Sequence, residues 1–105
     1  SSDLISSTDK PLLELATTGS SGKAPWKNEA SSIMQTLHGL LASRDLPKLR
    51  QENPHKLYVV NLFGKPHHAL RASAGFHIVF EWDGTLQRAT NLRVMHVNDI
   101  GKLRE

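Results

Sequence analysis

Histidine, glutamate and arginine side chains recur through the second half of this 105-residue chain. Together these residue types can cleave RNA without a cofactor. A base activates the neighbouring 2′-hydroxyl, an acid protonates the leaving oxygen, and a cation stabilises the charged phosphorane. The catalytic candidates, in which histidine and glutamate share the acid and base roles and arginine binds phosphate, are His68, Arg71, Glu81, Arg93 and His96. The candidates for further RNA contacts are Lys48, Arg50 and Lys65.

Simpler structural roles compete with these chemical ones. Arg71 and Arg93 stand among hydrophobic residues, where an arginine is costly to bury unless it meets an anion. For Arg93, an ion pair with Glu81 or Asp83 across a sheet competes with a phosphate-binding role. His68 follows His67 directly, so on a strand the two side chains point to opposite faces, and one solvated and one partly packed imidazole is the simpler expectation.

The sequence offers little for metal or cofactor chemistry. It contains no cysteine, which excludes disulfides, thiolate zinc sites and cysteine nucleophiles. His77, His96 and Glu81 could join one of the paired histidines around a metal, but their spacing matches no zinc pattern. A P-loop, a dinucleotide fingerprint and a GxSxG elbow are also missing. We therefore expect neither a metal site nor a cofactor.

Length and charge point to one domain that works in water. The chain of 105 residues carries a net charge of +3, with three lysines against four acids in residues 1–30 and ten cations against six anions thereafter. This excess favours approach to a phosphate backbone, although a solvated surface with extra lysines fits equally well. The apolar runs are far shorter than the roughly 18 residues of a membrane span. Met removal and excision from a longer protein both explain a start at Ser1.

The first part of the chain, residues 1–27, is predicted to hold one short helix and a flexible Gly/Ser connection. Asp9 can cap a helix over Asp9–Leu15, with Pro11 in its first turn and Gly19 to stop it. The turn residues of Thr17–Pro25 predict the connection, which Trp26 anchors on the core.

Residues 28–105 are predicted to form the body of the domain, beginning with a helix over Asn28–Ala42. Its apolar residues follow the helical period and form one face: Ile33, Met34, Leu37, Leu40 and Leu41. Asn28 or Ser31 can cap the first turn, and Pro47 ends any continuation. The stretch Lys48–Asn53 is then a charged loop or a final short turn.

Four extended segments follow this helix. Lys56–Phe63 is β-branched and aromatic and is expected to be a buried central strand, followed by the shorter segment His67–Arg71. Phe76–Trp82 alternates aromatic or aliphatic with polar residues, and Asp83–Gly84 predicts a hairpin to Thr85–Val97. The chain is thus predicted to be α+β, with N-terminal helices on one face of a three- or four-stranded antiparallel sheet and the other face largely open.

The register of that hairpin decides which residues share the open face. A three-residue loop with a glycine bulge, which we prefer to a two-residue loop, places Phe76 opposite Leu92 and Trp82 opposite Leu86. Leu92 and Val94 then join the core. The residues expected on the opposite face are His77, Glu81, Ala89, Asn91, Arg93 and Met95.

The segment from Leu70 to Val97, LRASAGFHIVFEWDGTLQRATNLRVMHV, resembles the closing hairpin of the RelE/ParE toxin family. It contains an arginine-ended strand, an aromatic strand ending in an acidic residue, an acidic-Gly turn and a final L-R-V-x-H strand. The order of the elements, helices first and sheet second, also resembles that of a wider group of toxins. This group joins barnase and RelE with the tRNA-cleaving colicins and contact-dependent growth inhibition toxins. The resemblance implies that Arg71, Arg93 and His96 act on RNA phosphate. The weak first helix and flexible connection replace the family's helix hairpin, which favours a free-standing tRNase.

The residues and the resemblance together predict a metal-independent endoribonuclease toxin that cleaves tRNA. Its partners would be RNA and an acidic immunity or antitoxin protein. It would act in the cytoplasm, of a target cell if it is delivered in interbacterial competition. The alternative is a noncatalytic α+β domain that binds protein or nucleic acid, but a single aromatic, Trp82, is too little for a stacking platform. An immunity protein ranks last, because the partners of basic nucleases are usually acidic.

Overall fold

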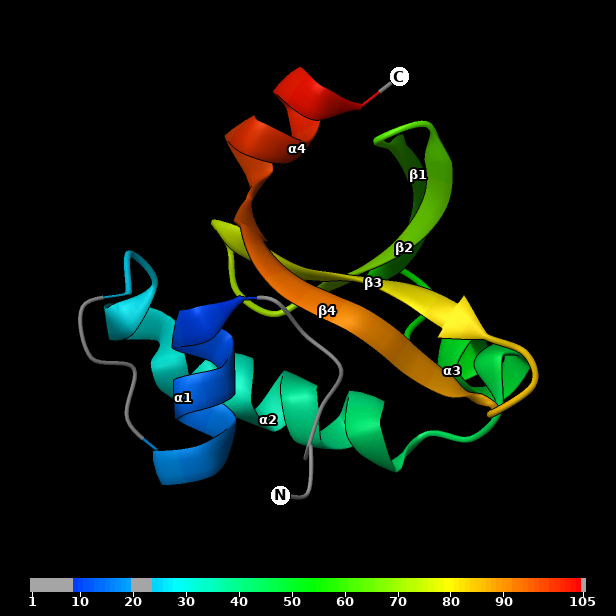
Figure 1. The fold of residues 1–105 in the computed structure, drawn as a ribbon, viewed down its shortest axis with the longest axis horizontal. Coiled ribbons are helices and arrows are strands. Elements are labelled where there is room, and N and C mark those ends of the chain that lie inside the picture. Colours follow the sequence, from blue (N-terminus) through cyan, green and yellow to red (C-terminus); the bar gives the residue numbers. More distant parts are fainter. Residues whose placement is uncertain (1–8, 20–23, 105) are drawn as a thin grey trace.

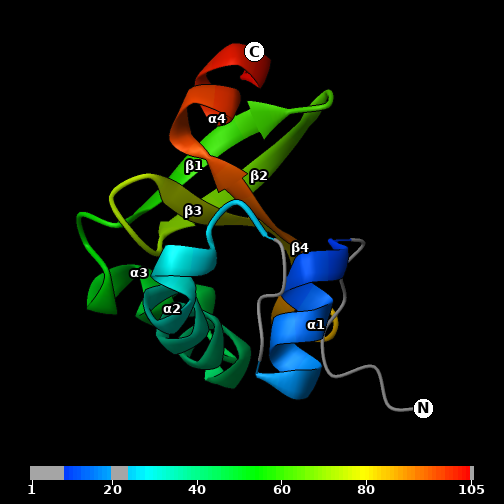
Figure 2. The ribbon, with the colours of Figure 1, turned by 90° about the vertical axis from the view of Figure 1, so that its left-hand side faces the viewer.

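The computed structural model describes residues 9–19 and 24–104, which form helices on both sides of a four-stranded antiparallel sheet (Figures 1 and 2). The predicted α+β class is confirmed. In chain order, the elements are α1 (Lys10–Thr18), a 3-10 helix (Lys27–Glu29), α2 (Ala30–Ala42), α3 (Leu46–Glu52), β1 (Leu57–Leu62), β2 (Lys65–Arg71), β3 (Phe76–Asp83), β4 (Arg88–His96) and α4 (Val97–Leu103).

The predicted cap and stop residues of α1 are confirmed, but the helix extends beyond the predicted Leu15 to Thr18. The Asp9 side chain accepts a hydrogen bond from the Leu12 amide, and Gly19 closes the helix in the left-handed conformation. The second carboxylate oxygen of Asp9 accepts from the Val94 amide at 2.9 Å, which ties the start of α1 to β4. The predicted Gly/Ser connection lies in part outside the described residues, at 20–23.

The predicted caps and end of the second helical region need correction. The N-cap residue of α2 is Glu29, in place of the predicted Asn28 or Ser31, and its side chain makes no cap hydrogen bond. The segment that we expected to be a charged loop or a final short turn forms α3, because Pro47 stands in its first turn and Asp45 accepts from the Lys48 amide. Proline fits a first helical turn, whose amides lack helical partners in any case.

The main core lies between the sheet and helices α1, α2 and α3, which cover one face of the sheet (Figure 2). We call this face the helix face. Trp26 is buried in this core, as predicted, together with Ile33, Leu37 and Leu40 of α2. The sheet contributes Leu57, Leu70, Ile78, Phe80, Ala89 and Leu92.

The strand order is β1-β2-β3-β4, so β1 is an edge strand. The prediction of a buried central strand there is wrong. Val59 of β1 is 56% exposed, and Tyr58 is also exposed. Strand β2, which we expected to be a minor segment, is instead paired on both sides. Apolar composition predicted the strand correctly, but composition alone does not specify its neighbours.

The hairpin between β3 and β4 has neither of the two predicted registers. Asp83 pairs with Arg88 across a four-residue loop, because its carboxylate accepts from the Thr85 and Leu86 amides and holds a wider turn. Further along, a β-bulge places two residues, Asn91 and Leu92, opposite Phe80. Asn91 has a φ of 53°, a left-handed conformation that asparagine tolerates better than most residues.

The bulge changes which residues of β4 face the core. Leu92 and Val94 pack against the main core, as predicted. Ala89, however, is buried in that core opposite Trp82 instead of on the other face. The extra residue shifts the alternation of side chains by one position, so the residues before the bulge change face.

The opposite face of the sheet, which we call the outer face, is partly covered by a helix that the sequence analysis missed. Helix α4 follows β4 and folds back over this face (Figures 1 and 2). Its buried residue, Ile100, joins a second apolar cluster with Val60, Leu62, Ala69 and Val79. The outer face is therefore less open than predicted, and its polar residues lie around this cluster.

Candidate active site

A hollow of about 400 Å³ opens on the outer face, beside the turn between β1 and β2. We call it the outer hollow. The residues that line it come from the turn and three strands, and they are Phe63, Lys65, His67, Glu81, Asn91 and Arg93. The strand register brings them together: His68 pairs with Phe80, so their neighbours His67 and Glu81 are level on the outer face. The bulge turns Asn91 toward the same place.

Glu81 lines the outer hollow and is held by a short hydrogen bond. The Asn91 side-chain amide donates to Glu81 Oε2 at 2.7 Å. This bond lowers the pKa of Glu81, and the positive charges of His67, Lys65 and Arg93 act in the same direction, while partial burial opposes them. Glu81 is therefore an ionised carboxylate at neutral pH and is able to accept a proton.

His67 lies beneath Glu81 and is only 2% exposed. Its Nδ1 is 3.0 Å from the Lys65 carbonyl oxygen, which can only accept, so Nδ1 carries a proton and donates. The other ring nitrogen, Nε2, faces Glu81 Oε2 at 3.9 Å. Nε2 is thus the ring nitrogen directed toward the hollow, since Nδ1 is held by the backbone.

Arg93 and Phe63 form the rim of the outer hollow. The guanidinium carbon of Arg93 lies 5.0 Å from the centre of the Phe63 ring, within the range of a cation–π interaction. The ion pair with Glu81 or Asp83 that competed for Arg93 is not the contact formed, although Arg93 contributes to the electrostatics of Glu81.

Phe63 has an unusual backbone conformation for a bulky residue. It precedes Gly64 in a two-residue turn, and both have a positive φ, of 55° and 76°. Asparagine or glycine would fit this turn without strain, whereas phenylalanine there costs about 1–3 kcal/mol. The turn nevertheless presents the ring to solvent, with 54% of Phe63 exposed. An exposed aromatic ring in a strained position suggests a function.

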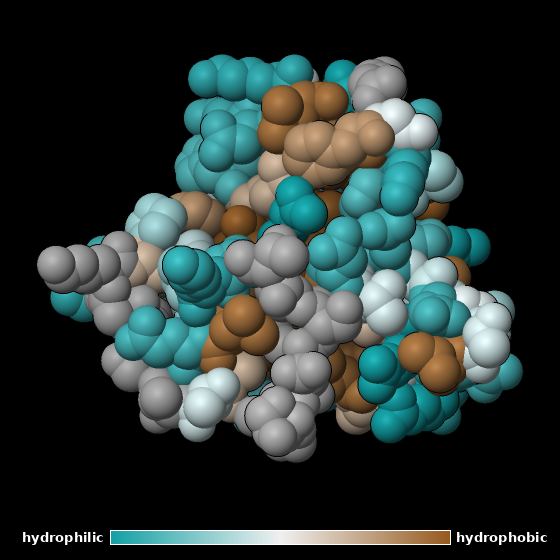
Figure 3. Space-filling view, viewed as in Figure 1, coloured by the Kyte–Doolittle hydropathy of each residue, from teal (hydrophilic) through white to brown (hydrophobic). Residues whose placement is uncertain are grey.

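Among the coloured residues, hydrophilic side chains predominate on the side of the molecule drawn in Figure 3. Hydrophobic atoms reach the surface in this view where the tip of the β1–β2 hairpin approaches α4. Each of these two elements has an exposed large apolar side chain, Phe63 in the turn and Leu103 in α4.

The structure places His68 away from the outer hollow, on the helix face. Its ring stacks on Phe80 with centroids 5.6 Å apart, and its Nδ1 is buried without a hydrogen-bond partner. Burial lowers the pKa of His68, and the charges of Arg50 and His67 add to this effect. The expected pair of one solvated and one packed imidazole is wrong, because His67 is buried and His68 is partly buried.

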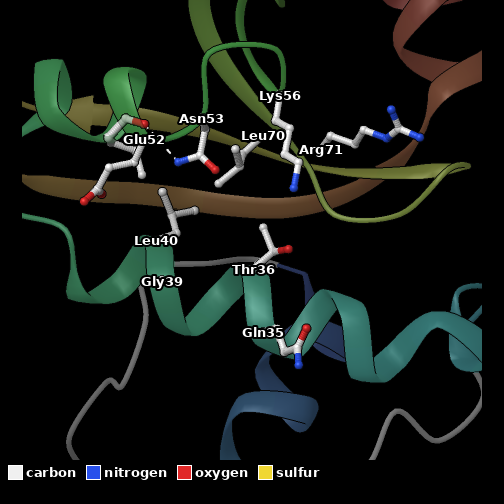
Figure 4. Close-up of a pocket in the computed structure, with 10 residues that line it drawn as sticks. Gln35, Thr36, Gly39, Leu40, Glu52, Asn53, Lys56, Leu70 and Arg71 are labelled. Carbon is white, nitrogen blue, oxygen red and sulfur yellow. Dashed lines mark hydrogen bonds between the residues drawn. The ribbon is translucent and has the colours of Figure 1, made fainter.

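His96 and Arg71 also lie apart from the outer hollow. His96 packs edge-on against Phe76 at the other end of the sheet, and its Nδ1 accepts from the Asn98 amide, which caps α4. Arg71 ends β2 at the same end. It borders a pocket of about 170 Å³ between α2, α3 and the sheet, and its guanidinium points away from the pocket centre (Figure 4). There the Asn53 amide is already bonded to the Leu49 carbonyl.

Of the expected RNA contacts, only Lys65 lines the outer hollow. Lys48 and Arg50 are exposed on α3, in the layer that covers the helix face. The structure thus brings together Glu81, Arg93 and Lys65 of the predicted set.

The sequence analysis missed the site roles of Phe63, His67 and Asn91. The alternation of side chains along β2 could have identified His67. Because Leu70 faces the core, His68 lies on the same face of the sheet and His67 lies on the opposite face. Asn91, a polar residue with high left-handed propensity inside a strand pattern, was a signal for the bulge. The strain at Phe63 had no counterpart in the sequence beyond the following glycine.

No protein-family model matches this sequence, and no curated protein matches it. In the described part of the chain, no helix has the length and apolar character to cross a membrane. Residues 9–19 and 24–104 also contain no group of three or more histidine or acidic side chains placed to hold a metal ion.

Proposed function

We propose that this domain is a metal-independent endoribonuclease and that the outer hollow is its active site. The observation that supports this most is the position of Glu81, an ionised carboxylate oriented by Asn91 and surrounded by His67, Lys65 and Arg93. A base among cations is what phosphodiester cleavage by the 2′-hydroxyl requires.

The proposed reaction uses these groups as follows. Glu81 takes the proton of the 2′-hydroxyl, whose oxygen then attacks the adjacent phosphorus. Lys65 and Arg93 neutralise the charge that develops on the phosphorane. In the proposed cycle His67 starts as an imidazolium with a proton on each ring nitrogen, and the 5′-oxygen leaves with the proton from Nε2, the nitrogen that faces the hollow. The products are a 2′,3′-cyclic phosphate and a free 5′-hydroxyl, and a proton passes back from Glu81 to His67 between turnovers.

The exposed ring of Phe63 specifies the form of the substrate in this proposal. A nucleobase next to the cleaved bond can stack on this ring, while Arg93 binds the phosphate. Bases in a duplex are already stacked on each other, so the site favours unpaired nucleotides such as those in tRNA loops. Sequence preference would be weak, because every base offers a stacking surface.

The same proposal extends to the domain's partners. A ribonuclease of this kind acts on cytoplasmic RNA, and as a toxin delivered to a competing cell it requires an immunity protein in its producer. Because Lys65 and Arg93 provide the charge around the outer hollow, an acidic protein would cover it best.

The test is cleavage of total tRNA by the purified domain in the presence of EDTA. We expect discrete fragments with cyclic phosphate ends, and no cleavage of a DNA oligonucleotide, which lacks the 2′-hydroxyl. Glu81→Gln should abolish the fragments. Glu52→Gln is the matched control, since it makes the same change on an exposed residue of α3. Equal cleavage by wild type and Glu81→Gln would overturn the proposed mechanism.

A second candidate function is nucleic-acid binding without cleavage. Two aromatic side chains, Tyr58 and Phe63, are exposed and could stack on bases. The sequence analysis considered only Trp82 for this role, so the structure favours binding more strongly. Tight binding of RNA without fragments under all conditions would support this second function and contradict the first.

A further inference from the structure

A second polar cluster lies on the outer face, at the other end of β2 from Lys65. Tyr58 of β1 reaches across β2 to His77 of β3, and its hydroxyl is 2.7 Å from His77 Nδ1. The residue between them, which pairs with Tyr58, is Ala69, whose small side chain leaves room for this contact. Arg71 is the direct cross-strand neighbour of His77 on the same face.

The hydrogen bond between Tyr58 and His77 has a defined direction. The partial burial of the Tyr58 hydroxyl raises its pKa, so the hydroxyl keeps its proton and donates it to Nδ1. Burial and the nearby Arg71 lower the pKa of His77, so the ring is neutral at pH 7 and carries its proton on Nε2. The cluster therefore offers a ring N–H donor next to an arginine.

The charges around this pair are positive. Arg71 acts on His77, and Arg104, which follows α4, acts on Tyr58. Neither guanidinium forms an ion pair with another described residue, and no described carboxylate contributes to the electrostatics of either ring. An arginine beside a ring donor, with no acid to neutralise it, is an arrangement suited to an anion.

We propose that Tyr58, His77 and Arg71 form a phosphate-binding site, distinct from the outer hollow, with Arg104 adding to its positive potential. Arg71 binds two phosphate oxygens through its planar fork, and His77 donates from Nε2 to another. The phosphate can be terminal, as in a nucleotide 5′-phosphate, or an internal diester of a strand. Phosphate binding here does not depend on cleavage in the outer hollow, so either proposal can fail alone.

The test follows the histidine ring signals of the full chain by NMR during titration with inorganic phosphate. The signals of His77 should shift with saturation, and its pKa should rise, because a bound anion favours the protonated ring. The signals of His68, whose ring stacks on Phe80 on the helix face of the sheet, should not move. Titration with 5′-AMP tests binding of a terminal phosphate. Titration with the dinucleotide d(ApA), which has only an internal phosphate, tests binding of a diester.

Variants of exposed residues make the test specific. Arg71→Gln should weaken phosphate binding by about tenfold or more, the scale of a lost charge-assisted hydrogen bond. Arg44→Gln, which removes the same charge between α2 and α3, should bind as the wild type does. Tyr58→Phe should weaken binding less, because Arg71 remains. Saturable binding that is equal in wild type and Arg71→Gln, or no shift of His77 with any of the three probes, would overturn the proposal.

Discussion

Replacement of Arg93 by alanine separates the structural role of this residue from its proposed catalytic role. Its guanidinium lies 5.0 Å from the ring centre of Phe63, at a partly exposed site. A contact of this kind contributes about 0.5–1 kcal/mol. For a domain of this size, each kcal/mol corresponds to a change of about 4–8 °C in melting temperature, so Arg93→Ala should lower it by roughly 2–8 °C.

The catalytic effect expected for the same variant is much larger. If Arg93 stabilises the phosphorane, its loss should reduce kcat by about 10² or more, the scale of one preorganised electrostatic contact. Cleavage is measured with a tRNA substrate at a temperature where both proteins remain folded, and unfolding is measured on the same preparations by circular dichroism.

Phe63→Leu is the matched control, because it removes the cation–π contact and leaves the guanidinium in place. Leucine keeps the strained backbone conformation of position 63, so this variant should lower the melting temperature by a similar amount through loss of the cation–π contact alone. Loss of base stacking should raise KM by about tenfold and leave kcat nearly unchanged. An Arg93→Ala protein that is destabilised but cleaves at the wild-type rate would remove Arg93 from the active site.

Further outcomes are expected on chelation, on a change of pH and in two helix-cap variants. Activity should persist in EDTA, and a loss that zinc or magnesium restores would contradict the proposed chemistry. Because the folded-state pKa of Glu81 is lowered, its contribution to stability is present above the pKa of an unfolded glutamate and is lost as pH falls through the folded value. Glu81→Gln should therefore flatten the acid limb of stability against pH, and the acid limb of kcat/KM for the wild type should lie below the usual range of a glutamate. Asp9→Ala should reduce the free energy of unfolding by about 2 kcal/mol, because a cap and the bond to the Val94 amide are both lost. Asp45→Ala, which loses only the cap of α3, should cost about 1 kcal/mol in a urea titration.

The sequence predicted the elements of this fold better than their ends and neighbours. Apolar periodicity located α2, and the residues at both ends of α1 predicted its cap and its stop, because these signals are local. Helix α3 was missed because Pro47 was interpreted as a terminator, although proline also starts helices. Helix α4 has a single buried residue, Ile100, and so lacks an apolar period to detect.

The candidate site was harder to predict than the fold, because it depends on register. Glu81 and Arg93 were placed correctly on the outer face, since each lies in a strand with clear alternation. The choice of His68 over His67 failed because residue type alone does not decide the face. We predicted a catalytic role for His96 from the L-R-V-x-H pattern, but its Nδ1 caps α4 and its ring packs on Phe76. A motif thus identified the strand and not the local role of the histidine.

The bulge at Asn91 connects the fold to the proposed chemistry. Without the extra residue, strict alternation from Arg93 would direct Asn91 to the outer face as an ordinary strand residue and leave Ala89 outside the core. With the bulge, Ala89 is buried opposite Trp82, and the left-handed backbone of Asn91 brings its amide within 2.7 Å of Glu81. The same local distortion therefore completes the core on one face and orients the proposed base on the other. Bulges are often found beside active sites for this reason, since they redirect a side chain at little cost to the sheet.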